Sequence, residues 1–105
     1  MKFSIRGRNL QTTNAIRQHV ERRLAFALDR LAHRVTDVAI RLSNDQQHSG
    51  AEARACQLHI QLQGASDVLV EAHDRDLYTA IDRAADRARE AVRRNLKRGL
   101  RRRRN

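Results

Sequence analysis

Hydrophobic residues recur along the chain at two spacings, which predict different secondary structures. Phe3 and Ile5 alternate with polar residues, and this period of two predicts a half-buried strand over residues 2–6 that ends at Gly7. Further along, apolar residues recur every three or four positions, which predicts a helix capped at its start by Thr13. The apolar positions of this helix are Ile16, Val20, Leu24, Ala27, Leu28 and Leu31.

The middle of the chain returns to an alternating pattern. Residues 38–42, 56–62 and 68–72 place aliphatic side chains at alternate positions, so three more strands are predicted. A polar loop at 43–50 and a glycine-containing turn at 64–67 separate these strands.

The last third of the chain is predicted to be one long amphipathic helix. Asp74 or Asp76 can cap its first turn, where a carboxylate accepts unpaired backbone N–H groups. Gly99 is expected to end the helix, so that residues 1–98 form one folded domain and residues 99–105 form an arginine-rich, disordered tail. The apolar stripe consists of Leu77, Ile81, Ala84, Ala85, Ala88, Val92 and Leu96.

This order of elements, β-α-β-β-β-α, predicts an α+β fold. A strand–helix–strand start favours a right-handed parallel crossover, and the short connections that follow favour antiparallel hairpins. Because each strand has one apolar face, both helices should cover the same face of a four-stranded mixed sheet, giving a two-layer sandwich. The open face should then carry Ser4, Arg6, Arg41, Gln57, His59 and Gln61.

Several side chains of the first helix lie off its apolar stripe. Phe26 is expected to fill the seam with the neighbouring helix, since a large aromatic residue is more often packed than exposed. His19, Arg22 and Arg30 are expected on the side of the helix away from the stripe.

In the last helix, Tyr78 lies at the edge of the apolar stripe and is expected to be mostly buried. Asp82 and Asp86 are one helical turn apart, and we interpret them as surface charges that face neighbouring arginines. We do not interpret them as a catalytic pair of carboxylates.

The charge of the chain is concentrated at its end. The chain has 22 Lys and Arg against 12 Asp and Glu, a formal net charge of +10, and eight of those cations lie between Arg93 and Arg104 with no acid among them. The other 14 basic and 12 acidic residues leave a net charge of only +2 elsewhere. A local patch rich in arginine predicts an anionic partner, since the guanidinium fork suits phosphate.

No pattern of catalytic or metal-binding residues is present. His19, His33, His48, His59 and His73 show no metal-ligand spacing with Cys56 or with one another. Cys56 lies on the apolar face of its strand and is expected to be a small core residue. We therefore predict no enzyme, cofactor, metal or small-molecule substrate. No apolar run is long enough to span a membrane and no signal peptide is evident, so we expect a cytoplasmic location without a membrane partner.

Three segments carry a resemblance to a known family. They are residues 10–17 (Leu-Gln-Thr-Thr-Asn-Ala-Ile-Arg), residues 20–24 (Val-Glu-Arg-Arg-Leu) and, most specifically, residues 71–82 (Glu-Ala-His-Asp-Arg-Asp-Leu-Tyr-Thr-Ala-Ile-Asp). Over nearly all of its length except the tail, the chain resembles the bacterial family of hibernation-promoting factor and ribosome-associated inhibitor A.

The resemblance implies a β-α-β-β-β-α domain that binds the small ribosomal subunit. Such a domain occupies the channel used by mRNA and tRNA and blocks translation in stressed or resting cells, mainly through contacts of basic helix residues with ribosomal RNA. The residues expected to make these contacts are Arg22, Arg30, Arg83, Arg87, Arg93, Arg94, Lys97, Arg98, Arg101 and Arg102.

The chain also departs from the family. Glu90 and Leu96 stand where the family usually has basic residues, and the loop at 44–50 lacks lysine, whereas Arg87 and Arg94 keep the family's charge. No acidic extension or second ribosome-dimerising domain follows, so the chain resembles a short, divergent member.

Two alternative functions stay open from the sequence. One is a general RNA- or DNA-binding module without ribosome specificity, and the other is a domain that binds an acidic protein. The sequence leaves the oligomeric state open, with a monomer slightly favoured.

Overall fold

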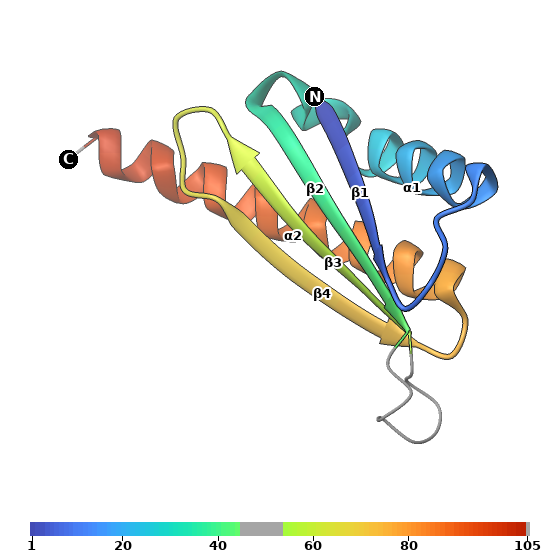
Figure 1. Cartoon of the computed structure of the whole chain (residues 1–105). Coiled ribbons are helices and arrows are strands. Elements are labelled where there is room, and N and C mark those ends of the chain that lie inside the picture. Colours follow the sequence, from blue (N-terminus) through green and yellow to red (C-terminus); the bar gives the residue numbers. More distant parts are fainter. Residues whose placement is uncertain (45–53, 105) are drawn as a thin grey trace.

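The computed structural model describes residues 1–44 and 54–104 (Figure 1). The predicted loop at 43–50 lies largely outside the described residues. The first helix ends at Ala27, so Leu31 lies in a separate 3₁₀ helix. The elements are β1 (Lys2–Arg8), α1 (Asn14–Ala27), the 3₁₀ helix η1 (Asp29–Arg34), β2 (Val35–Asn44), β3 (Arg54–Leu62), β4 (Val68–Asp74) and α2 (Leu77–Arg104).

The four strands form one mixed sheet in the order β1-β2-β3-β4. β1 pairs with β2 in parallel, and the β2–β3 and β3–β4 pairs are antiparallel, as the sequence predicts. Figure 1 shows both helices on the same face of this sheet. The predicted two-layer α+β sandwich is therefore confirmed.

The core lies between the helices and the covered face of the sheet. Strand residues at alternate positions, such as Val38, Ile40 and Leu42, are buried there together with Val20 and Leu24 of α1. The predicted stripe of α2 is buried from Ile81 to Val92 and half-buried at its two ends. Small alanines fill most of this stripe, which lets the helix backbone pack closely on β3 and β4. They are Ala84, Ala85 and Ala88, and Ala80, which lies outside the predicted stripe, is buried as well.

Both helices begin at the predicted caps. Thr13 Oγ1 accepts a hydrogen bond from the Ile16 backbone N–H at 3.2 Å. At the start of α2, Asp76 Oδ1 accepts from the Tyr78 backbone N–H at 3.4 Å. Each cap satisfies an amide in the first turn that has no partner inside the helix.

Gly7 does not end the first strand, which continues to Arg8. A side chain at this position would place its Cβ 2.5 Å from the Leu10 carbonyl oxygen, so the glycine permits a close approach by the chain that follows β1. That chain turns through Asn9, whose φ of 58° is in the left-handed region.

The predicted helix end at Gly99 is also wrong, because α2 continues to Arg104. A Cβ at Gly99 would lie 3.6 Å from the Gly64 carbonyl oxygen and 3.7 Å from Ala65 Cβ. Gly99 therefore marks the place where α2 passes the β3–β4 turn. The domain boundary at residue 98 and the mobility of residues 99–105 in solution stay predictions.

Candidate nucleic-acid interface

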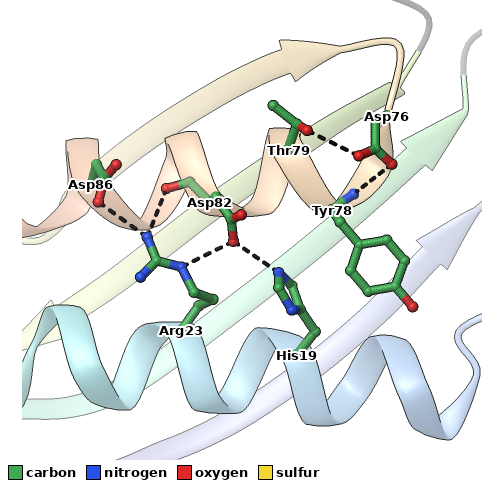
Figure 2. Close-up of polar contacts among 7 residues, drawn as sticks. All are labelled: His19, Arg23, Asp76, Tyr78, Thr79, Asp82 and Asp86. Atoms are coloured by element: carbon green, nitrogen blue, oxygen red, sulfur yellow. Dashed lines mark hydrogen bonds and ion pairs between the residues drawn. The ribbon is translucent and has the colours of Figure 1, made fainter.

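A polar seam joins α1 to α2 and fixes how the basic residues of the two helices lie (Figure 2). Asp82 Oδ1 is 2.8 Å from His19 Nε2 and accepts from Arg23 Nε at 2.9 Å. Arg23 Nη2 also donates to Asp86 Oδ1 at 3.2 Å. Asp82 and Asp86 therefore face an arginine, as predicted, but it belongs to the other helix.

The prediction that His19 lies on the outer side of α1 is wrong. Its ring is half-buried at the seam and meets the ring of Tyr78 edge-on, with the centroids 4.7 Å apart. α1 faces both the sheet and α2, so its covered surface is wider than its aliphatic stripe. The signal for this seam was the matched spacing of four between His19 and Arg23 and between Asp82 and Asp86.

The two predictions about aromatic residues are also wrong. Phe26 does not fill the seam and is 73% exposed, because His19 and Arg23 already occupy the side of α1 that meets α2. Tyr78 is 38% exposed rather than mostly buried, since it packs against the edge of the His19 ring and not into the core.

One row of arginines runs along α2, and its first two members contact β4. Arg83, Arg87, Arg94 and Arg98 are separated by four, seven and four residues, which keeps them on one side of the helix. Arg83 Nη1 lies 3.7 Å from Asp74 Oδ1, and Arg87 Nη1 donates to the Glu71 carbonyl oxygen at 2.5 Å. Arg87 is thereby positioned against β4, and this bond leaves its other N–H donors for a further acceptor.

The remaining predicted contacts lie on three elements. Arg93 pairs with Glu90 at 3.3 Å, but both side chains are well exposed, so the pair holds Arg93 weakly. Arg94, Lys97 and Arg98 are exposed as well. Arg22 on α1 and Arg30 in η1 are exposed, and Arg101 and Arg102 belong to the last turns of α2.

A shallow groove of about 410 Å³ joins η1 to the basic half of α2. Leu31 of η1 lines one side of it, and Leu100 of α2 is among the residues opposite. Its other lining residues are Glu90, Arg93, Arg94, Leu96 and Lys97. The groove brings Leu31, the neighbour of Arg30 in sequence, next to three of the predicted contacts on α2.

The open face of the sheet is less charged. Its predicted residues are exposed, except that Gln57 is half-buried. A hollow of about 340 Å³ crosses this face between Arg6 and Arg41, and Leu69, which is 65% exposed, lies at its rim. His59 Nε2 is 2.9 Å from Asp67 Oδ2. Lys2 also lies on this face, but the acidic Asp37 is its neighbour on β2, so this face is a weaker candidate for phosphate binding than α2.

Cys56 is buried in β3, as predicted, and burial raises the pKa of its thiol to about 12. A thiol that stays protonated is a poor nucleophile. Within residues 1–44 and 54–104, no group of three or more His, Cys, Asp and Glu side chains could hold a metal ion. His48 lies outside the described residues. Among the described helices, none is both long and apolar enough to cross a membrane.

Comparisons with known proteins agree with this architecture. The chain is similar to the Thermus thermophilus Protein Y N-terminal domain, for which there is a crystal structure. The two sequences are 37% identical, and the structures superpose with a TM-score of 0.69 over 89% of this chain and 93% of that one. The structure of a ribosomal subunit interface protein from Coxiella burnetii superposes with a TM-score of 0.73 over 89% of this chain and 96% of its own. The two sequences are only 15% identical, so this similarity shows a shared fold alone.

A curated relative agrees as well. The ribosome hibernation promotion factor of Deinococcus radiodurans is 28% identical over 83 residues, which are 79% of this chain and 42% of that protein, so the chain spans less than half of the relative's length. The family described as Sigma 54 modulation protein / S30EA ribosomal protein matches residues 3–99. The matched segment contains all of the sheet except Lys2 and both helices up to Gly99, so this chain belongs to that family.

Proposed function

We propose that this protein binds the small ribosomal subunit through ribosomal RNA and blocks the channel used by mRNA and tRNA, so that translation stops under stress or in stationary phase. The observation that carries the proposal is the placement of the cations. They lie along one long helix whose inner stripe is fixed in the core, so they form a positioned surface.

Two findings support a ribosomal partner. The chain belongs to the S30EA ribosomal protein family, and its relative in Deinococcus radiodurans is a ribosome hibernation promotion factor. In addition, Arg87 is held against β4 by its bond to the Glu71 carbonyl, so its guanidinium has a defined position from which to bind a phosphate. A ribosomal partner would place the protein in the cytoplasm.

The proposed mechanism needs no bond chemistry. The described domain is a slab with extents of 48 × 26 × 17 Å. When the arginines of α2 and of the adjoining η1 neutralise ribosomal RNA phosphates, the slab occupies its binding place as a rigid body. An mRNA strand or a tRNA then cannot enter the same volume.

Co-sedimentation tests this function. Purified small subunits should carry the protein down at physiological salt, and pre-bound mRNA and initiator tRNA should exclude it. An excess of unstructured bulk RNA should compete poorly, because the proposed site depends on the shape of the subunit. Equal competition by bulk RNA, mass for mass, would contradict a specific ribosomal site.

A second candidate is a general RNA- or DNA-binding module. The observation in its favour is the run Arg101 to Arg104 in the last turns of α2, since contacts of arginine with phosphate carry no sequence information. Filter binding to bulk RNA and DNA separates the two functions. Only the general module should bind both polymers as tightly as it binds small subunits.

A further inference from the structure

Phe26 is the most exposed large apolar side chain among the residues whose burial the structure describes, at 73%. It lies in the last turn of α1 and takes no part in the core. A single exposed apolar residue needs no explanation by itself. The charged residues on either side of Phe26 distinguish it from such a case.

Arg22 precedes Phe26 by four residues and Arg30 follows it by four. Four residues make about one helical turn, so Arg22 and Phe26 lie on one side of α1. η1 follows directly, with the Leu31 N–H donating to the Leu28 carbonyl oxygen at 2.9 Å, and Arg30 in its first turn is exposed like Phe26. Arg22, Phe26 and Arg30 are thus a row in sequence, with one exposed aromatic side chain between two exposed cationic ones.

The charge of this region is not cancelled locally. Neither Arg22 nor Arg30 pairs with a carboxylate within 1–44 and 54–104, whereas Arg23 is committed to Asp82 and Asp86. From residue 17 to residue 34 the chain has five arginines against Glu21 and Asp29. The region therefore keeps an excess of positive charge, which suits an anionic ligand from outside this protein.

The row also adjoins the interface already described. Arg30 is next in sequence to Leu31, which lines the same groove as Arg93, Arg94 and Lys97 of α2. A polyanion bound along the second half of α2 would therefore lie close to Arg30, with Glu90 as the one acidic residue that lines the groove.

We propose that Phe26 is a stacking platform for an unpaired RNA base, and that Arg22 and Arg30 bind the phosphates on either side of that base. The inference rests on the proposed RNA-binding function and adds the form of the RNA, which is a single-stranded or flipped-out nucleotide. Every base has a π-face that can stack on an aromatic ring, and arginines beside the ring neutralise the backbone. Arg22 lies about 6 Å from Phe26 along the axis of α1, at about 1.5 Å per residue, and Arg30 follows in η1, so two long side chains can reach the backbone on either side of one stacked nucleotide.

A protein partner fits this row less well. The fully buried centre of a protein interface is more apolar than its rim, whereas Phe26 is the one apolar side chain of its row. An apolar contact with a protein is therefore an outcome of the test below and not part of the proposal.

The chain contains no tryptophan, so Phe26→Trp introduces a single fluorophore at the proposed platform. Its emission should be quenched by single-stranded oligoadenylate and by small ribosomal subunits, and much less by a blunt RNA duplex. Leu69→Trp is the matched control, because Leu69 is 65% exposed but lies on the open face of the sheet. Its emission should change little with any of the three.

Failure of this inference can be told apart from failure of the proposed function. If small subunits co-sediment with the Phe26→Trp protein but leave its emission unchanged, the stacking platform is overturned and ribosome binding stands. If the wild-type protein does not co-sediment at all, the proposed function itself fails.

Affinity for small subunits supplies a second measurement. Phe26→Ala should weaken binding by about 5- to 150-fold, the range expected for one base stacked on an aromatic ring, without changing the salt dependence. Phe26→Leu should lose nearly as much, because leucine has no π-face. A Phe26→Leu protein with wild-type affinity would show an apolar protein contact instead and would overturn the proposal.

Discussion

Arg23 donates through Nε to Asp82 at 2.9 Å, although 59 residues separate the two in sequence. The bond joins α1 to α2 directly, and Arg23 Nη2 lies 3.5 Å from the Asp82 carbonyl oxygen as well (Figure 2). Because α1 and α2 both carry proposed RNA contacts, this pair sets the spacing between those contacts. Its loss should affect stability first and RNA binding second.

Asp82→Ala should lower the free energy of unfolding by about 1 kcal/mol, because it leaves Arg23 and His19 without their shared acceptor. The effect stays modest since the Asp82 side chain is 43% exposed and solvent screens it. Asp86→Ala is the control, because that side chain is 76% exposed and, among the described residues, bonds only to Arg23 Nη2 at 3.2 Å. Urea melts with equal midpoints for the two variants would contradict the dominant role of Asp82.

Ile81→Ala should cost about 2–5 kcal/mol of stability, because Ile81 is 1% exposed and its truncation leaves a cavity against the sheet. Leu77→Ala should cost less, since Leu77 is only half-buried at the start of the stripe. Leu100→Ala, at a position 51% exposed, should change stability by less than about 0.5 kcal/mol. Chemical denaturation of the three variants gives the order directly, and a wild-type midpoint for Ile81→Ala would contradict this packing of α2.

The fold followed from the sequence because its two spacings are unambiguous. Alternation at Phe3 and Ile5 and the three-and-four steps from Ile81 to Val92 each assign one face to the core, and all of these faces are buried when both helices cover the same side of the sheet. Side chains at the helix seam were harder to place, because their burial depends on how α1 turns toward α2 and not on either helix alone. For this reason the expected burial of two residues was reversed: His19 lies at the seam between the helices and Phe26 is exposed.

The structural roles of two glycines could not be predicted from the sequence for a similar reason. Gly7 and Gly99 both have the residue type that often ends an element, yet both lie inside one. What they provide is space for a neighbouring backbone, which a single sequence does not reveal. The RNA contacts stay predictions. The local charge in the sequence points to α2, whereas the bond from Arg87 to the Glu71 carbonyl and the exposure of Phe26 became visible only in the structure.

Gly99→Ala should stabilise the protein by about 0.5–1 kcal/mol, because alanine favours the helix and its Cβ would meet Gly64 and Ala65 at ordinary contact distances of 3.6 and 3.7 Å. Far-ultraviolet circular dichroism should show equal or greater helix content. Gly7→Ala is the opposite case, since its Cβ would lie 2.5 Å from the Leu10 carbonyl oxygen, and it should destabilise the protein. A loss of helicity in Gly99→Ala would restore Gly99 as a helix end.

Binding to small subunits should depend steeply on salt. If about six phosphates are neutralised, the logarithm of the association constant should fall with the logarithm of the salt concentration at a slope near −5, since each contact contributes roughly −0.9 or somewhat less. A flat response to salt would contradict an interface made of phosphate contacts.

Charge reversal locates those contacts. Arg94→Glu combined with Arg98→Glu should weaken binding far more than Lys2→Glu combined with Arg41→Glu, although both pairs change the net charge equally. The first pair lies in the arginine row of α2, whereas the second lies on β1 and β2. Equal losses from the two pairs would point to the open face of the sheet instead.

Cys56 should resist alkylation by iodoacetamide at a pH of about 8 in the native protein and react quickly in urea, because burial raises the pKa of its thiol from 9.0 to about 12. The unfolded chain releases this proton near the lower value and the folded chain near the higher one. Cys56 therefore contributes stability below a pH of about 9 that is lost as the pH rises toward 12. Cys56→Ser should show a weaker loss of stability over that range.

The passage of α2 beside Gly64 and Ala65 has a consequence for how the protein approaches a partner. At about 1.5 Å per residue, the 28-residue helix is about 42 Å long, and Figure 1 shows its last turns projecting past the end of the sheet. The positive charge is thus displaced from the centre of mass, which gives the molecule a large dipole moment. In the field of a polyanion this dipole experiences a torque, so the protein turns its helix end forward before any contact forms. Added salt shortens the range of that torque to about 10 Å at 0.1 M, and beyond that distance the molecule must find its orientation by collision.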